Sequence, residues 1–210
     1  MNTFELADHF ENALKKCLIK YTCVLGDELS FFNVRLNTIN IPGLCVTVSF
    51  DDYASHIVKL SCELEMCTDH SKRSALLELF NTIMYDFKFV RFVITDEYCI
   101  KADCNILILD ENGHSAARQI FMNMLTLAEV CDNAYPHIIN ILENDHPTYS
   151  GGVRFGAKGK FKKPGEDGDV VVDTELLDTL VNRFCRSDDD GSYREYLEEA
   201  FEELSDEDMQ

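Results

Sequence analysis

The sequence predicts an α+β fold in which helices pack against an antiparallel sheet. Two observations predict it. Hydrophobic and polar residues alternate through residues 29–67 and 89–109, which is typical of strands with one buried and one exposed face. Residues 3–21, 71–85 and 115–143 instead repeat their hydrophobic residues at helical spacing. The predicted order is helix, three strands, helix, two strands, helix.

The first helix is expected over residues 3–21, with acidic residues in its first turns and basic residues in its last, which suits the helix dipole. Three strands are expected to follow it, over residues 29–36, 44–50 and 56–67. A Pro-Gly pair and an Asp-Asp pair mark the turns between these strands.

The second half of the domain begins with the second helix and continues with a predicted hairpin, whose strands cover residues 89–94 and 98–109. The third helical region starts at Ser115. Pro136 is predicted to interrupt it, because proline disrupts a helix interior. Residues 135–143 are therefore expected to form a separate helical turn or a kinked continuation.

Composition divides the chain into three parts. Residues 1–149 carry the α+β domain, and residues 150–172 are rich in Gly and Lys and are expected to form a linker or loop. Residues 173–210 are expected to form an acidic helical appendage, with helices over 174–185 and 192–204.

The chain is strongly acidic, since 38 acidic residues against 19 basic ones give a formal net charge of -19. Nucleic-acid binding relies largely on Lys and Arg that neutralise phosphates, so this charge disfavours nucleic acids and anionic lipid surfaces. No apolar run approaches the ~18 residues that span a membrane. We therefore expect a protein partner, basic or amphipathic, and neither nucleic acid nor membrane.

Cysteine usage predicts the compartment. The chain has nine cysteines, an odd number, and most lie inside apolar runs. The residues after Met1 lack the basic region and apolar core of a signal peptide. Together these features predict free thiols in a reducing cytoplasm.

The sequence contains no recognisable catalytic motif. A nucleophilic cysteine needs a base within hydrogen-bond reach. We expect Cys45, Cys62, Cys99 and Cys104 to be structural instead, since they lie within strands as small apolar residues do. The sequence thus predicts no catalytic residue.

No metal or cofactor site is predicted either. Cys62 and Cys67 are five positions apart, as are Cys99 and Cys104, and on a strand this odd offset puts the two thiols on opposite faces. A site that joins Cys67 to His70 is the one alternative, and it lacks a second pair of ligands. The Gly-rich and Asp-rich stretches fit neither a phosphate-binding loop nor a calcium-binding loop.

Five aromatic or apolar residues of the last two segments are the candidate partner-binding residues. Tyr196, Phe201 and Leu204 form an apolar stripe on the acidic final helix, and we expect this stripe to pack on its own domain more readily than on a partner. Phe155 and Phe161 lie among the bases of the linker, which can contact an acidic partner or the acidic appendage.

Residues 76–81, Leu-Leu-Glu-Leu-Phe-Asn, end the second helix, and residues 89–94, Phe-Val-Arg-Phe-Val-Ile, form the next strand. With the order of elements, this pattern resembles the YbjN family and the type III secretion chaperone-like fold, over roughly residues 1–145. The resemblance implies a small acidic bacterial protein, a regulator or chaperone, that binds an extended segment of a partner and often dimerises.

We therefore expect a non-catalytic protein-binding module, chaperone-like or regulatory, that uses its sheet and helix surface. Two alternatives remain open. One is an enzyme with a dispersed site, for which Cys67, His70 and His114 are the candidate groups. The other is a self-associating structural protein, such as a homodimer formed through an exposed edge of the sheet.

Overall fold

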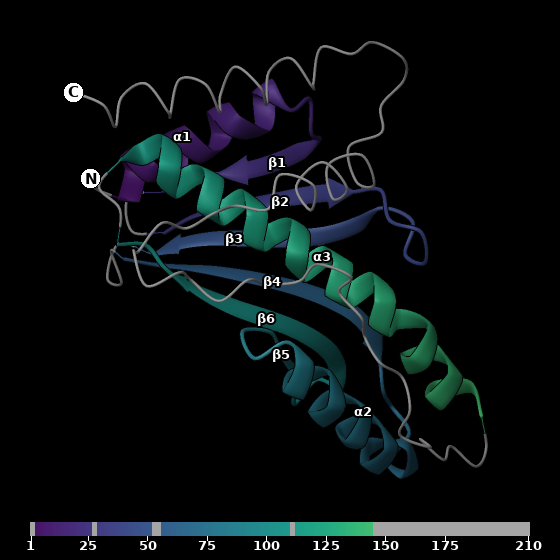
Figure 1. The fold of residues 1–210 in the computed structure, drawn as a ribbon. Coiled ribbons are helices and arrows are strands. Elements are labelled where there is room, and N and C mark those ends of the chain that lie inside the picture. The colour runs from purple at the N-terminus through teal and green to yellow at the C-terminus, as the bar shows by residue number, and fades with distance from the viewer. Residues whose placement is uncertain (1–2, 27–28, 52–55, 110–111, 145–210) are drawn as a thin grey trace.

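The computed structural model describes residues 3–26, 29–51, 56–109 and 112–144 (Figure 1). Within them the predicted α+β class is confirmed, with three α-helices packed on one six-stranded antiparallel sheet. None of the described helices combines the length and the hydrophobicity needed to cross a membrane. The elements follow in the order α1 (Thr3–Lys16), β1 (Tyr21–Val24), β2 (Leu29–Leu36), β3 (Leu44–Asp51), β4 (Ile57–Met66), the 3-10 turn η2 (His70–Lys72), α2 (Arg73–Asp86), β5 (Arg91–Ile94), β6 (Cys99–Leu107) and α3 (Gly113–Glu143).

The strands lie in the order β1-β2-β3-β4-β6-β5, so β5 forms one edge although it precedes β6 in the chain. The register aligns the buried positions of neighbouring strands. Val48 of β3 pairs with Leu60 of β4, and Leu60 pairs with Cys104 of β6. All three side chains are buried, so this row forms the centre of the core.

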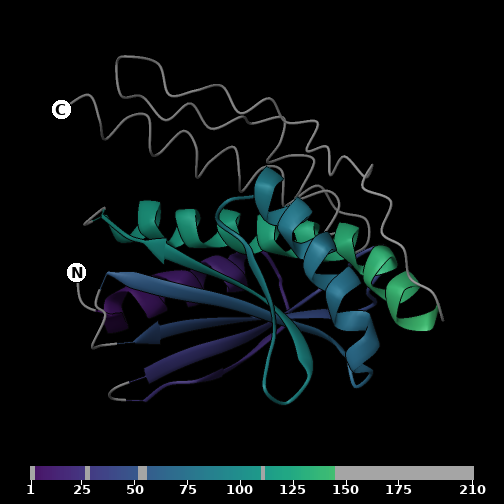
Figure 2. The ribbon, with the colours of Figure 1, turned by 90° about the horizontal axis from the view of Figure 1, so that it is seen from below.

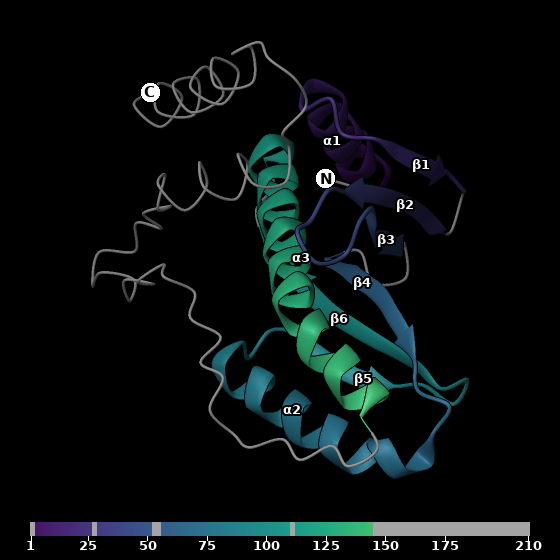
Figure 3. The ribbon, with the colours of Figure 1, turned by 90° about the vertical axis from the view of Figure 1, so that its right-hand side faces the viewer.

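All three helices lie on the same face of the sheet. α1 packs beside α3, and α3 runs across β3, β4 and β6 (Figures 2 and 3). Phe10 of α1 meets Phe32 and Phe50 of the sheet, with ring centroids 5.4 Å and 5.8 Å away. All three rings are fully buried. Burial of each such side chain stabilises the fold by about 1.5–3 kcal/mol.

The first helix ends earlier than predicted, and an additional strand follows it. Leu18 has a positive φ of 51°, and the Ile19 N–H donates to the Leu14 carbonyl at 3.1 Å, which closes the helix C-terminus. The chain then enters β1, which the sequence analysis did not predict. Three of its four residues are exposed, so β1 lacks the buried alternation that marks the other strands.

Of the two expectations for residues 135–143, the separate helical turn is wrong and the continuation is confirmed, since α3 continues through Pro136 to Glu143. Proline has no N–H to donate to the carbonyl four residues earlier, that of Asp132. The side-chain amide of Asn40 donates to this carbonyl instead, at 2.9 Å. A residue of the β2–β3 loop thus satisfies the group that the proline leaves without its helical partner.

The carboxylate of Asp132 joins the same loop to α3. It is fully buried and accepts hydrogen bonds from the backbone N–H groups of Ile39, Asn40 and Ile41, at 3.3, 2.7 and 3.1 Å. The loop therefore packs on the helix through three backbone N–H groups in addition to the Asn40 side chain.

Candidate functional site

The sheet face opposite the helices, called the open face below, carries the functional candidates. The odd-numbered side chains of β2, β3, β5 and β6 lie on this face. So do the odd-numbered side chains of β4 up to Glu63 and the even-numbered side chains of β1. The side chains between them in β2, β3, β4 and β6 point to the opposite face, into the core. No helix among the described residues packs on the open face (Figure 3).

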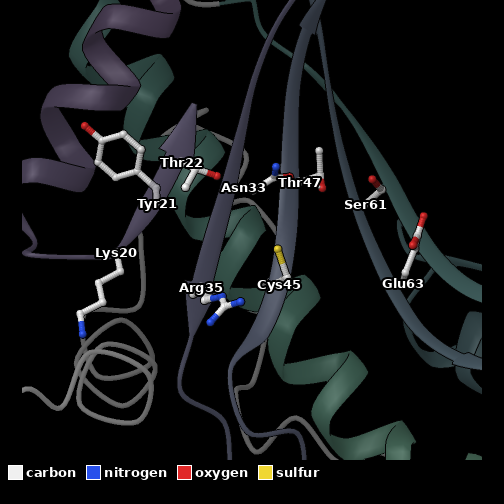
Figure 4. Close-up of a pocket in the computed structure, with 9 residues that line it drawn as sticks. All are labelled: Lys20, Tyr21, Thr22, Asn33, Arg35, Cys45, Thr47, Ser61 and Glu63. Atoms are coloured by element: carbon white, nitrogen blue, oxygen red, sulfur yellow. Dashed lines mark hydrogen bonds between the residues drawn. The ribbon is translucent and has the colours of Figure 1, made fainter. Parts of the chain in front are cut away.

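A row of polar side chains crosses the open face from one edge of the sheet to the other. Thr47 Oγ1 donates to Asn33 Oδ1 at 2.9 Å. Asn33, Thr47 and Ser61 stand side by side in the close-up, as the pairing requires (Figure 4). In strand order the members of this polar row are Thr22, Asn33, Thr47, Ser61, Asp103 and Arg91.

An ion pair closes the polar row at the β5 edge. Arg91 donates to both carboxylate oxygens of Asp103, each at 2.9 Å. Asp103 is only 7% exposed, and its hydrogen bonds and charge raise the pKa of the Arg91 guanidinium. Bidentate Arg–carboxylate geometry is specific as well as strong, so the pair fixes the edge strand to β6.

The other half of the polar row borders a groove of about 630 Å³. Two parallel rows line it. One is the polar row from β1 to β4, and the other contains Lys20, Arg35, Cys45 and Glu63 (Figure 4). The two cations lie at the β1–β2 side of the groove, and the carboxylate lies on β4 (Figure 4). The groove therefore has a cationic side and a single acidic side chain opposite it.

Exposed apolar side chains gather on the open face toward the end where β2 begins and β6 ends, around the Asp51 carboxylate of β3. The register places the large apolar residues of four strands at this end. Exposed fractions of 44–54% show that these side chains remain accessible among the described residues. This apolar end consists of Val24, Leu29, Ile57 and Leu107, with half-buried Phe31 beside them.

Cys45 lies in the groove and is exposed, so the expectation that it is a structural core residue is wrong. Alternation along β3 places it with Thr47 on the open face, while Leu44 and Val46 point inward. Partial burial raises the pKa of the Cys45 thiol, and Arg35 offsets this only in part. The thiol is therefore protonated at neutral pH, and no histidine lines the groove.

The other three cysteines expected to be structural lie on both faces of the sheet. Cys62 and Cys104 are buried in the core as expected, whereas Cys99 is half-buried on the open face. Burial raises the pKa of the Cys104 thiol to about 11. These positions confirm that Cys99 and Cys104 point to opposite faces of β6.

The candidate groups of a dispersed catalytic site do not come together. Cys67 is buried beside the Asp69 carbonyl, 3.5 Å from it, and its N–H pairs with Tyr98 just before β6. His114 lies beyond the other end of β6, at the start of α3. A nine-residue strand spans roughly 30 Å, so these groups are far outside hydrogen-bond reach.

His70 and His114 each contact another ring instead. His70 meets the Tyr98 ring at a centroid distance of 5.3 Å, and His114 meets the His9 ring of α1 at 4.8 Å. The described part of the chain contains no group of three or more His, Cys, Asp or Glu side chains that could hold a metal ion. A Cys67–His70 site would thus lack further ligands within the described ranges.

The five partner-binding candidates predicted from the sequence all lie outside the described residues. They are Phe155, Phe161, Tyr196, Phe201 and Leu204. The same holds for the predicted linker over residues 150–172 and the predicted acidic appendage over 173–210. The sequence analysis did not single out the open face, although the polar residues at alternate positions of β2 and β3 are a signal for it.

No protein-family model, curated protein or solved structure matches this chain. The resemblance to the YbjN family and to the type III secretion chaperone-like fold therefore stays a prediction.

Proposed function

We propose that this chain is a non-catalytic protein-binding module, chaperone-like or regulatory, and that the open face of its sheet is the binding surface. One observation carries the proposal. A six-stranded sheet is covered by helices on one face, while the other face presents an ordered polar row, a groove and an apolar end.

The size of the open face fits a protein partner. Six strands about 4.8 Å apart span roughly 25 Å across the sheet. The eight residues of β2 or β3 span roughly 25 Å along it, and the edge strands β1 and β5 have four residues each. The area is therefore on the order of 600 Å², close to the roughly 800 Å² that each partner contributes to a standard interface. The strands already fix the backbone that carries these side chains, so binding needs to order little of the main chain.

The chemistry of the face supports binding and disfavours catalysis. The accessible Cys45 thiol is protonated at neutral pH, and no histidine lies among the groove residues to deprotonate it. All eight described cysteines are free, which supports a reducing compartment such as the cytoplasm. The YbjN resemblance implies the same kind of activity, namely recognition of another protein.

The test blocks the face with a bulky neutral side chain at an exposed position. Asn105 lies on the open face of β6, next to Lys59, and is exposed. The full-length Asn105→Trp variant is used to capture proteins from a lysate of its own cells, beside the wild type. Asn12→Trp, at an exposed position of α1, is the matched control because it adds the same side chain on the helix side.

We expect a specific protein to be retained by the wild type and by Asn12→Trp, and to be lost from Asn105→Trp. Unchanged circular dichroism and unfolding midpoints establish that both variants are folded. Retention by all three proteins would assign the interaction to another surface. Retention of nothing above background by any of them would contradict the module itself.

A further inference from the structure

We propose that the open face recognises an acidic segment of its partner, with carboxylates near Lys20 and Arg35 and apolar side chains on the apolar end. This inference rests on the proposed function and deepens it, since it names the chemistry of the partner. It also runs against the first expectation from the sequence, which is that so acidic a chain binds basic partners.

The charge of the open face opposes that of the chain as a whole. The chain carries a net charge of -19. The open face nevertheless holds more cations than carboxylates when Lys20 beside it is included. The cations are Lys20, Arg35, Lys59, Lys101 and Arg91, and the carboxylates are Asp51, Glu63 and Asp103. A basic partner would meet the wrong sign of charge here, whereas an acidic one would be attracted and oriented.

Three of these cations are available for a ligand. Arg91 is occupied by Asp103. Lys101 lies directly opposite Glu63 in the strand register, where the carboxylate offsets its charge. Lys20, Arg35 and Lys59 are exposed, and within the described ranges none of them forms an ion pair. Charge-assisted hydrogen bonds from such groups to carboxylates are about twice as strong as neutral ones.

The order of groups along β2 sets the length of the ligand. Arg35 stands at one end of this strand, and Leu29 stands at the other, next to the apolar end. Six residues of strand cover about 20 Å, which equals six residues of an extended peptide or roughly thirteen of a helix. Lys59 lies on the row next to the polar row, which also holds Val24 and Phe31 of the apolar end. A matching segment therefore carries acids at one end and through its middle, and large apolar residues at the other.

A nucleic acid would also offer negative charge, but the observations favour a peptide. Asp51 and Glu63 stand on the same face, and the net charge of -19 repels a continuous line of phosphates. The apolar end has no counterpart in a sugar-phosphate backbone. An oligonucleotide is therefore included as a competing ligand in the test.

The test measures fluorescence anisotropy of labelled peptides of about eight residues, long enough to cross the face. The probe has Asp and Glu in its first half and Leu and Phe in its second. One control peptide replaces the acids by Lys, and another replaces the apolar residues by Ser. Full-length protein is used throughout, as the wild type, Arg35→Glu, Lys59→Glu and the charge control Lys16→Glu on the helix side of the molecule.

We expect the acidic, apolar probe to bind and both control peptides to bind at least about tenfold more weakly, a difference of about 1.4 kcal/mol. Arg35→Glu and Lys59→Glu should each weaken the probe about tenfold, while Lys16→Glu leaves it unchanged. Equal binding of the Lys peptide, or indifference to both open-face substitutions, would overturn the proposal. An oligonucleotide that binds more tightly than the probe, and that Arg35→Glu weakens to the same extent, would also overturn the proposal.

Two further results separate this inference from the proposed function. If a captured partner is lost on Asn105→Trp but survives Arg35→Glu and Lys59→Glu, the open face binds protein and the acidic preference is wrong. Carbodiimide cross-links from Lys59 to the acidic residues 188–208 of the same chain, or of a second copy, would show that this segment occupies the open face. That result would also overturn the partner assigned here.

Discussion

The carboxylate of Asp132 shows how one side chain determines the connection between two layers of the molecule. It accepts three backbone hydrogen bonds from the β2–β3 loop while fully buried. Buried donors that lose their acceptor cost about 1–3 kcal/mol each at sites where water cannot replace it. The loop is partly exposed, so water will recover some of this loss.

We therefore predict that Asp132→Ala lowers the free energy of unfolding by about 2–4 kcal/mol. Urea denaturation followed by circular dichroism measures it. Asp132→Asn keeps one acceptor oxygen and should lose clearly less. An Asp132→Ala variant as stable as the wild type would show that the loop does not depend on this carboxylate.

Tyr21 makes the fold sensitive to high pH. Burial first, and then its 2.7 Å hydrogen bond to Glu11, raise the pKa of the Tyr21 hydroxyl from 10.0 to about 12. Because the folded-state pKa is the higher one, this contribution to stability is complete below pH 10 and disappears as the pH rises toward 12.

The prediction is that the stability difference between the wild type and Tyr21→Phe shrinks between pH 10 and pH 12. Other groups titrate in this range, including the Cys104 thiol with its raised pKa, but both proteins share them. Unfolding midpoints measured across this range give the difference directly. A constant difference would mean that the Tyr21 hydroxyl titrates alike in the folded and unfolded chain.

At the scale of elements, the end of α1 is a site where the sequence and the backbone disagree. Leu18 adopts a left-handed conformation, φ 51°, which glycine adopts at little cost. Its side chain is 70% exposed, so little packing is lost on removal. Leu18→Gly should stabilise the protein by up to about 1 kcal/mol, measured as a raised unfolding midpoint. Leu18→Ala is the control, and a Gly variant no more stable than the Ala variant would contradict the argument.

The passage of α3 through Pro136 couples the helix to the β2–β3 loop. The Asn40 side chain bonds the Asp132 carbonyl that Pro136 leaves without a helical donor. Asn40→Ala should therefore cost about 1 kcal/mol in the wild type. In a Pro136→Ala background the new backbone N–H competes for the same carbonyl, so the cost should be smaller. A double-mutant cycle measures this coupling, and strictly additive effects would rule it out.

Which elements the sequence predicts depends on how much of each one is buried. Alternation such as Val46–Thr47–Val48 predicts its strand because every second residue enters the core. β1 escapes prediction because its residues are mostly exposed and its place is set by pairing with β2. The sequence also leaves open whether the helix continues past Pro136, because the compensating donor, Asn40, lies 92 residues away from Asp132 in sequence.

At the scale of the whole molecule, the sequence predicts the fold class but not the open face. The polar residues Asn33, Thr47 and Ser61 are visible as alternate positions of three strands. That they form one row depends on the strand register, which loops and long-range pairing determine. The net charge of -19 likewise does not indicate the charge of the open face, since most of the acidic residues lie elsewhere in the chain.

The central claim is that the open face, and not the helix layer, contacts a protein partner. Site-specific photo-cross-linking in living cells tests it most directly. A cross-linking amino acid replaces Asn105 on the open face or Asn12 on α1, both exposed positions. We expect one protein to be cross-linked through position 105 and not through position 12. Cross-linking of a partner through position 12 alone, or through neither position, would contradict it.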